Sequence, residues 1–141
     1  MLDWDHQLDI IVEDSKDSTE AVNATKVCIL SLENGKILMK TDQENAFKIS
    51  QEESETITNS FKINDFSFFK NDGIKIEETN YEFRNSVDGK LVFAKKKDLG
   101  TLTMLRTRTK VIIGFTQDGY QQSGTNLALK NFARYLEKIK L

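Results

Sequence analysis

The segment from Val111 to Leu136 reads VIIGFTQDGYQQSGTNLALKNFARYL and decides the fold class. It opens with Val111-Ile112-Ile113, an apolar run with the composition of a buried strand. After a polar loop, apolar residues recur at i, i+3, i+4 and i+7, which predicts a helix with one apolar stripe: Leu129, Phe132, Ala133 and Leu136. Such a helix buries its stripe against one layer, so the segment indicates a sheet covered by a helix.

The residues before this segment carry strand patterns. Apolar and polar residues alternate at three pairs of positions: Ile74 and Ile76, Tyr81 and Phe83, and Leu102 and Met104. Asp88-Gly89 is typical of a tight hairpin turn, and Leu91-Val92-Phe93 follows it as a further strand. We therefore predict that the pattern changes to β from Asp65 onward and forms a meander of antiparallel strands.

The first sixty residues predict two helices and one hairpin. Helical spacing of apolar residues predicts a helix near the N-terminus, at Trp4, Leu8, Ile11 and Val12. Val27 to Leu32 has the length of a buried strand, and Asn34-Gly35 favours a tight turn into a returning strand at Ile37 to Met39. Ser50 and Glu53 form a capping-box pattern, which predicts a helix that runs to about Ser60.

Together these elements predict an α+β fold with a central antiparallel sheet. The length of 141 residues suits one domain, residues 1–141, and the polar stretch from Asp14 to Thr25 is expected to be one loop. The chain shows no apolar run near the ~20 residues that cross a bilayer. Its N-terminus is acidic where a signal peptide is basic, and its single cysteine suits a reducing compartment. We expect a cytoplasmic protein.

The charge of the chain is unevenly distributed. Residues 1–60 hold 5 basic and 13 acidic side chains, whereas residues 84–141 hold 12 basic and 4 acidic ones. This asymmetry indicates one basic face, which favours an acidic partner or an anionic lipid surface, although simple solvation explains it equally well. The overall pI of about 5.5 argues against a nucleic-acid partner.

The sequence offers no support for an enzyme, a cofactor or a metal site. His6 is the only histidine, which makes a poor metal site, and Cys28 lies in an apolar strand, where a buried unreactive thiol is expected. Glu52, Glu53 and Glu55 are expected to form the solvated start of a helix. Asn23-Ala24-Thr25 fits the glycosylation pattern, but without a secretory signal we interpret this match as incidental.

Several motifs together resemble the profilin family. Gly73 to Tyr81 is similar to the profilin segment in which a glycine opens a strand and a tight turn leads to a second strand that starts at an aromatic residue. Lys96-Lys97 resembles a basic pair of the family, and Leu102 to Thr107 resembles its apolar–Thr–apolar strand. The sharpest similarity runs from Gly119-Tyr120-Gln121 through Asn126 to Leu136. The order and spacing of these motifs across nearly the whole chain favour a divergent profilin, from an early-branching eukaryote or an actin-bearing archaeon.

The resemblance implies a sheet of about seven strands, with the two terminal helices packed together on one face and a further short helix on the other. It also implies a monomeric, cytoskeletal protein that binds monomeric actin and regulates actin polymerisation. Actin is acidic, so a basic face would assist the encounter. The positions that the resemblance assigns to actin binding are Lys96, Lys97, Arg106, Tyr120, Gln121, Ser123, Asn126 and Lys130.

Two further partners follow from the resemblance. Profilins bind proline-rich segments on an aromatic shelf between the terminal helices, where flat rings stack on a polyproline II helix. Trp4 and Tyr135 occupy two shelf positions here, whereas the others correspond to residues that are not aromatic: Gln7, Leu38 and Leu141. We therefore predict that proline-rich binding is weak or absent, or follows a different geometry. The basic half of the chain also suits phosphoinositide headgroups, as in other profilins.

A different adaptor on a related architecture is the alternative interpretation. Roadblock- or longin-like modules, which dock small GTPases, also combine a central antiparallel sheet with flanking helices, and fold alone does not determine function. The profilin interpretation requires the first and last helices to lie side by side on one sheet face. Helices on opposite faces would favour the adaptor.

Overall fold

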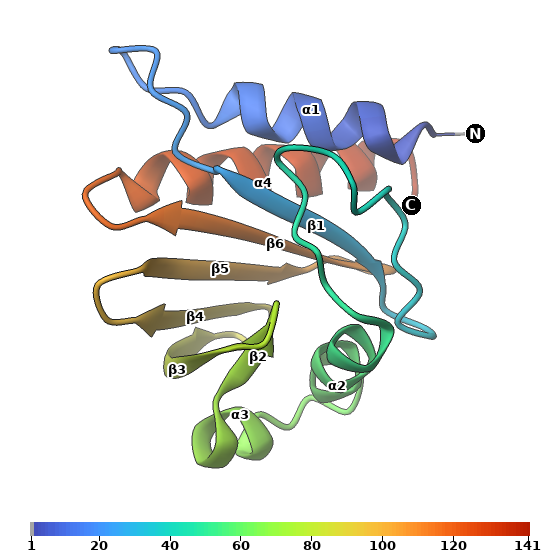
Figure 1. The fold of residues 1–141 in the computed structure, drawn as a ribbon. Helices are drawn as coiled ribbons and strands as arrows, with labels where there is room; N and C mark the ends of the chain where they lie inside the picture. Colours follow the sequence, from blue (N-terminus) through green and yellow to red (C-terminus); the bar gives the residue numbers. More distant parts are fainter. Residues whose placement is uncertain (1) are drawn as a thin grey trace.

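The computed structural model describes residues 2–141, which form a six-stranded antiparallel sheet with helices on both faces (Figure 1). The strand order in the sheet is β1-β6-β5-β4-β3-β2. Along the chain the elements are α1 (Trp4–Asp14), β1 (Lys26–Ser31), α2 (Gln51–Lys62), α3 (Ser67–Asp72), β2 (Ile74–Ile76), β3 (Thr79–Val87), β4 (Leu91–Lys96), β5 (Gly100–Arg106), β6 (Lys110–Gln117) and α4 (Gln122–Lys138).

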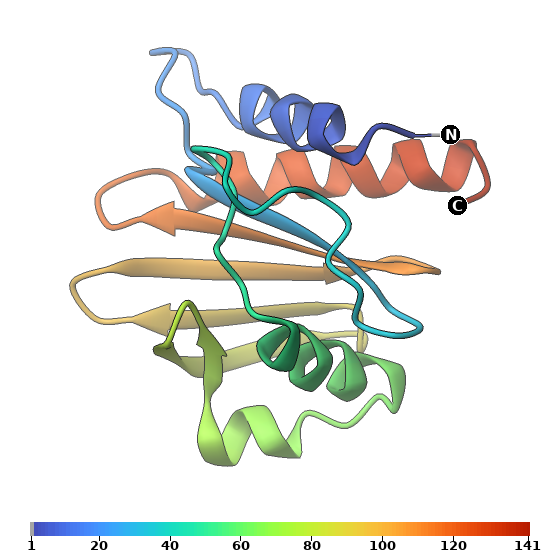
Figure 2. The same cartoon turned by 45° about the vertical axis from the view of Figure 1, so that its right-hand side comes forward.

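The two terminal helices lie side by side on one face of the sheet, where α4 contacts β5 and β6 and α1 contacts β1 (Figures 1 and 2). The helices α2 and α3 contact β1, β2 and β3 from the other side. This arrangement confirms the fold that the profilin resemblance implies, and the adaptor alternative finds no support. We call the side of the sheet that carries α4 the α4 face, and the other side the α2 face.

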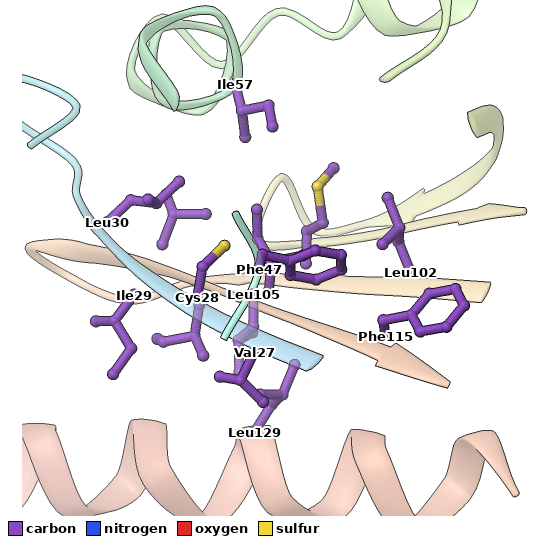
Figure 3. Packing of buried hydrophobic residues seen from close by; sticks show 14 of the residues in the cluster. Val27, Cys28, Ile29, Leu30, Phe47, Ile57, Leu102, Leu105, Phe115 and Leu129 are labelled. Atoms are coloured by element: carbon purple, nitrogen blue, oxygen red, sulfur yellow. The ribbon is translucent and has the colours of Figure 1, made fainter. Parts of the chain in front are cut away.

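The core fills both faces of the sheet because side chains along each strand alternate in direction. In β1, Cys28 and Leu30 point toward Ile57 of α2, whereas Val27 and Ile29 point toward α4 (Figure 3). These four side chains of β1 are fully buried. The apolar run in β1 therefore reflects burial on both faces of the sheet, not the single-faced burial that produces strict alternation.

The expected returning strand at Ile37 to Met39 is absent, so the sheet has six strands where about seven were predicted. Only an isolated bridge joins Leu30 to Ile37, and the Leu38 N–H donates to the Ile29 carbonyl at 3.0 Å. The next ladder position is lost because the Ile29 N–H bonds to the Met39 sulfur at 3.4 Å. The chain then leaves the sheet, since the Lys40 N–H donates to the Asp5 carboxylate at 2.7 Å.

The expectation of β structure from Asp65 onward is wrong for its first residues, which form α3. The Asp65 carboxylate accepts the Ser67 N–H at 2.9 Å and the Ser67 hydroxyl at 2.6 Å, which turns the chain into this helix. Phe66 and Phe69, at i and i+3, then pack against Phe61 with ring centroids 5.2 and 6.2 Å away. Local hydrogen bonds therefore start this helix, and aromatic contacts with Phe61 of α2 hold it in place.

A network of carboxylates joins α2 to the sheet. The predicted capping box is confirmed: the Ser50 hydroxyl accepts the Glu53 N–H, and the Glu53 carboxylate accepts the Ser50 N–H. The same carboxylate accepts the Glu77 and Glu78 N–H groups, both at 3.0 Å. These two residues form the β2–β3 turn with φ of 54° and 62°, a conformation unfavourable for glutamate. Glu53 therefore holds a turn whose own residues do not favour it.

Candidate functional site

Part of the sheet's α4 face is not covered by a helix. Paired residues of neighbouring strands share a face, and Phe93 of β4 pairs with Thr103 of β5, whose hydroxyl bonds to Asn126 of α4 at 2.6 Å. Phe93 and, by the same pairing, Leu91 therefore lie on the α4 face, and both are only partly buried. The outer side of α4 adds Leu127, which is 53% exposed. Apolar surface thus remains accessible beside α4.

The loop before α4 forms one end of this surface. Gly119 has a φ of +90°, and Tyr120 beside it is 46% exposed. The Asp118 N–H donates to the Leu99 carbonyl at 3.0 Å, so this loop is tied to the β4–β5 turn that contains Lys97. The two loops lie at the same end of the molecule (Figures 1 and 2).

Six of the eight residues that the resemblance assigns to actin gather around this surface and this end of the molecule. They are exposed or partly exposed residues of the two loops and of α4: Lys97, Tyr120, Gln121, Ser123, Asn126 and Lys130. We call this set, together with Leu91, Phe93 and Leu127, the α4 surface. Its charged members, Lys97 and Lys130, are basic and it includes three accessible apolar residues, although the exposed Asp98 and Asp118 lie in the same two loops. Basic and apolar residues together suit an interface with an acidic protein.

Lys96 and Arg106 lie elsewhere. Lys96 pairs with Gly100, and a side chain on Gly100 would meet the Phe115 ring, so Lys96 belongs to the α2 face. Arg106 turns to the same face, where its Nη1 donates to the Phe61 carbonyl at 3.4 Å, near the end of α2. A cation suits the carbonyl end of a helix, so Arg106 has a structural partner inside the protein.

Lys95 is the basic residue of β4 on the α4 face, and the motif comparison missed it. It pairs with Thr101 and follows Phe93 by two residues, so pleating directs its side chain to the same face as Phe93. Period-2 alternation from Phe93 could have identified it from the sequence. Leu127 carries no comparable signal, because an exposed leucine on a helix looks like any other apolar residue.

A basic groove of about 890 Å³ adjoins the α4 surface. Its basic residues come from the β3–β4 turn, the β5–β6 turn, α4 and the residues after α4: Lys90, Arg108, Lys130, Arg134 and Lys140. Arg106 also lines the groove, but its guanidinium bonds to the Phe61 carbonyl on the α2 face. Glu137 is the only acidic residue that lines it, and Leu105, Ala133 and Leu141 are apolar. Arg108 is held in place because its Nη2 donates to the Lys140 carbonyl at 2.8 Å. The groove is suited to a multiply charged anion.

A second groove, of about 450 Å³, lies between α1 and α4 and is mainly apolar. Ile10 and Tyr135 are each about two-fifths exposed along it, at 42% and 41%, and His6 and Gln7 also line it. Trp4 does not line this groove. Its ring lies 5.5 Å from the Lys110 Nζ, and partial burial lowers the pKa of that ammonium group. The two aromatic shelf residues are therefore not part of one groove wall, and Leu38 and Leu141 are partly buried.

Neither His6 nor Cys28, the potentially reactive side chains noted in the sequence, lies in a site that would make it reactive. His6 is exposed, and Cys28 is fully buried, where desolvation and then the nearby Glu77 and Glu53 carboxylates raise the pKa of the thiol well above its usual range. Across residues 2–141 no group of three or more His, Cys, Asp or Glu side chains is arranged to hold a metal ion. No helix within that same range is long and apolar enough to cross a membrane.

Comparisons with known proteins agree with this architecture. The chain is 35% identical to a profilin of Heliocidaris crassispina and 33% identical to one of Suberites domuncula, in each case over 98% of this chain and 99% of the relative. Among solved structures, Schizosaccharomyces pombe profilin superposes with a TM-score of 0.77 at 15% identity, covering 99% of this chain and all of that one.

Two complexes are also structurally similar. LokiProfilin1 bound to rabbit actin has a TM-score of 0.69 at 14% identity, covering 95% of this chain and 96% of that chain. Mouse profilin IIa bound to a double repeat from the FH1 domain of mDia1 has a TM-score of 0.63 at 18% identity, covering 84% and 90%. The family model for profilin matches residues 3–141, and this chain therefore belongs to the profilin family of non-enzymatic actin-binding proteins.

Proposed function

We propose that this protein binds monomeric actin through the α4 surface and thereby regulates actin polymerisation in the cytoplasm. The observation that carries the proposal is the joint exposure of apolar Phe93 and Leu127 and basic Lys97 and Lys130 around one region. Membership of an actin-binding family and the likeness to LokiProfilin1, solved with rabbit actin, support it. Apolar residues at the centre supply affinity, while the lysines steer the encounter with an acidic protein.

The test is a pyrene-actin polymerisation assay with Lys130→Glu and a matched control, Lys75→Glu. Both lysines are exposed, but Lys75 lies in β2 at the far edge of the sheet. Lys130→Glu should weaken inhibition of polymerisation about fivefold and reduce its salt dependence, whereas Lys75→Glu should not. Equal effects of the two variants, or no effect of the unmodified protein at micromolar excess, would contradict the proposal.

For proline-rich segments we propose weak binding in the groove between α1 and α4, against Tyr135 and Ile10. The mouse profilin IIa complex with an FH1 repeat supports this ligand class. The distinct setting of Trp4 beside Lys110 supports a geometry other than the shared aromatic shelf. Titration with a proline-rich peptide should change Trp4 fluorescence only slightly. The Tyr135→Ala variant should bind the peptide much more weakly than the unmodified protein. Tight binding accompanied by a large Trp4 signal would refute this geometry.

The basic groove supports a third proposal, the binding of phosphoinositide headgroups. Apart from Arg106, which bonds to the Phe61 carbonyl, five basic residues line this groove against one acidic residue. The groove shares Lys130 with the α4 surface, so lipid and actin should compete. Sedimentation with phosphoinositide-containing liposomes should be lost in Arg108→Glu and reduced by added actin. Equal sedimentation with phosphoinositide-containing and with neutral liposomes would contradict the proposed headgroup binding.

A further inference from the structure

Asn23 is a fully buried residue that joins two segments far apart in the sequence. Its Oδ1 accepts the Gln121 N–H at 3.0 Å, and its Nδ2 donates to the Ser15 carbonyl at 2.9 Å and the Asp17 carboxylate at 3.3 Å. The partners determine the orientation of the amide, because an N–H can only donate and a carbonyl can only accept. Asn23 therefore uses both ends of its side chain to connect the α1–β1 loop with the start of α4.

The start of α4 depends on this contact. The first N–H groups of a helix lack partners within the helix, and the N-cap residue, Gln121, makes no side-chain capping bond of its own. Gly124 in the first turn allows α4 to approach the loop, since a Cβ there would lie 2.6 Å from the Asn23 Nδ2 and 2.8 Å from the Ser15 carbonyl oxygen. The first turn of α4 is thus fitted against the α1–β1 loop.

The loop that presents Asn23 is itself held by internal hydrogen bonds. The Ser15 hydroxyl donates to the Val12 carbonyl at 2.7 Å and accepts the Ala24 N–H at 2.9 Å. The Asp17 carboxylate accepts the Thr19 N–H at 2.9 Å, and hydrogen bonds from Thr19 lower the pKa of this carboxyl. The loop therefore provides a fixed support for the Asn23 amide.

The loop Asp118–Gln121, in contrast, has few restraints near Gly119. A Cβ at Gly119 would find no heavy atom within 4 Å, and Tyr120 is exposed. The Asp118 N–H bond to the Leu99 carbonyl and the Tyr120 N–H bond to the Gln117 carbonyl, both at 3.0 Å, hold the first part of the loop. The Gln121 N–H bond to Asn23 fixes the backbone between Tyr120 and Ser123. These residues belong to the α4 surface.

We propose that Asn23 is a positioning residue for actin binding: by fixing the backbone of Gln121, it holds the loop Asp118–Gln121 and the first turn of α4 in their binding conformation. This inference rests on the proposed binding of actin by the α4 surface. Without the bond, actin must order the loop on binding, and that ordering cost appears as lost affinity. Asn23→Ala removes three side-chain hydrogen bonds, of which only the one to Gln121 restrains the α4 surface, so we expect about five- to tenfold weaker actin binding.

Ser15→Ala is the matched control. Ser15 is also fully buried, and its side chain makes two hydrogen bonds within the same part of the chain, but its hydroxyl does not contact α4. Ser15→Ala should lose similar stability, but it retains the Ser15 carbonyl and the Asp17 carboxylate that hold the Asn23 amide, so only Asn23→Ala should alter the start of α4. Amide hydrogen exchange at Gln121, measured by NMR, reports directly on whether the bond to residue 23 is present.

The experiment measures actin affinity, thermal stability and Gln121 amide exchange for the unmodified protein and both variants. The inference predicts weaker actin binding and faster Gln121 exchange in Asn23→Ala only. If Gln121 exchange accelerates but actin affinity equals that of Ser15→Ala, the positioning role is refuted while the proposed function stands. If the unmodified protein does not bind actin, both the proposed function and the inference fail. Unchanged Gln121 exchange in Asn23→Ala would overturn the structural basis of the inference.

Discussion

Replacement of Glu53 by alanine tests how much the carboxylate network contributes to stability. The side chain is 8% exposed and accepts three N–H groups, from Ser50, Glu77 and Glu78. Ser50 is an exposed residue whose N–H can bond to water instead, so loss of its hydrogen bond to Glu53 costs about 0.5–1 kcal/mol. The two turn N–H groups bond to a charged acceptor and contribute about 1.5 kcal/mol each. The free energy of unfolding of Glu53→Ala should therefore fall by about 3.5–4 kcal/mol.

Urea denaturation followed by circular dichroism measures this change. Thermal unfolding should shift downward by roughly 10–15 °C for a domain of this size. Glu52→Ala is the control, because Glu52 lies in the same first turn of α2 but is exposed and contributes only about 0.5 kcal/mol through the helix dipole. Glu53→Gln retains one acceptor oxygen and should give an intermediate value.

The result that would refute the reasoning is a loss below about 1 kcal/mol in Glu53→Ala, equal to that of an exposed cap. The network would then contribute nothing beyond the start of α2. Actin affinity offers a second check, because Glu53 lies on the α2 side of the sheet, away from the α4 surface. At a temperature where Glu53→Ala is folded, its actin affinity should equal that of the unmodified protein.

Four further outcomes follow from the structure. Glu78→Gly should stabilise the protein by about 0.5–1 kcal/mol, because glycine adopts the φ of 62° without strain and the Glu78 side chain is exposed; denaturation in urea measures it. Gly100→Ala should destabilise by about 2 kcal/mol or more, since its Cβ would clash with the Thr116 carbonyl and the Phe115 ring; the same assay with Gly119→Ala, where the space is open, separates clash from backbone strain. Cys28 should resist alkylation in the folded protein and react only on unfolding, because burial raises the pKa of its thiol; rapid labelling under native conditions would contradict this. Burial, and then the Glu77 carboxylate, raise the pKa of Tyr81 to about 12, so the folded protein favours the neutral phenol. The free energy of unfolding should therefore be unaffected below pH 10 and fall between pH 10 and 12, and Tyr81→Phe should remove this part of the loss.

Features that depend on local chemistry were predictable from the sequence. The capping box of Ser50 and Glu53 and the turn at Asp88-Gly89 carry their own signals, because each requires particular residue types at fixed spacing. The stripe of α4 likewise follows from helical periodicity alone.

Features that depend on distant partners were not predictable. The β2–β3 turn contains neither glycine nor asparagine at Glu77 and Glu78, and only the Glu53 carboxylate explains its conformation. The segment after Ile37 leaves the sheet because Asp5 of α1 binds it, which no local pattern reveals. At the site, Arg106 matched a motif by position, which did not reveal that its side chain donates to the Phe61 carbonyl of α2. Asn23 matched only a glycosylation pattern, although the folded chain buries it completely.

The position of β1 at the edge of the sheet has a consequence for synthesis on the ribosome. Its ladder partner is β6, with Lys26 opposite Phe115, and α1 packs on α4, so the first segment to emerge pairs with the last. Until residues beyond Lys110 are translated, β1 lacks its ladder partner β6 and α1 lacks α4, while β2 to β5 can already form hairpins. The apolar side chains of α1 and β1 that pack on α4 therefore stay uncovered during most of translation, and such exposed apolar surface is what chaperones bind.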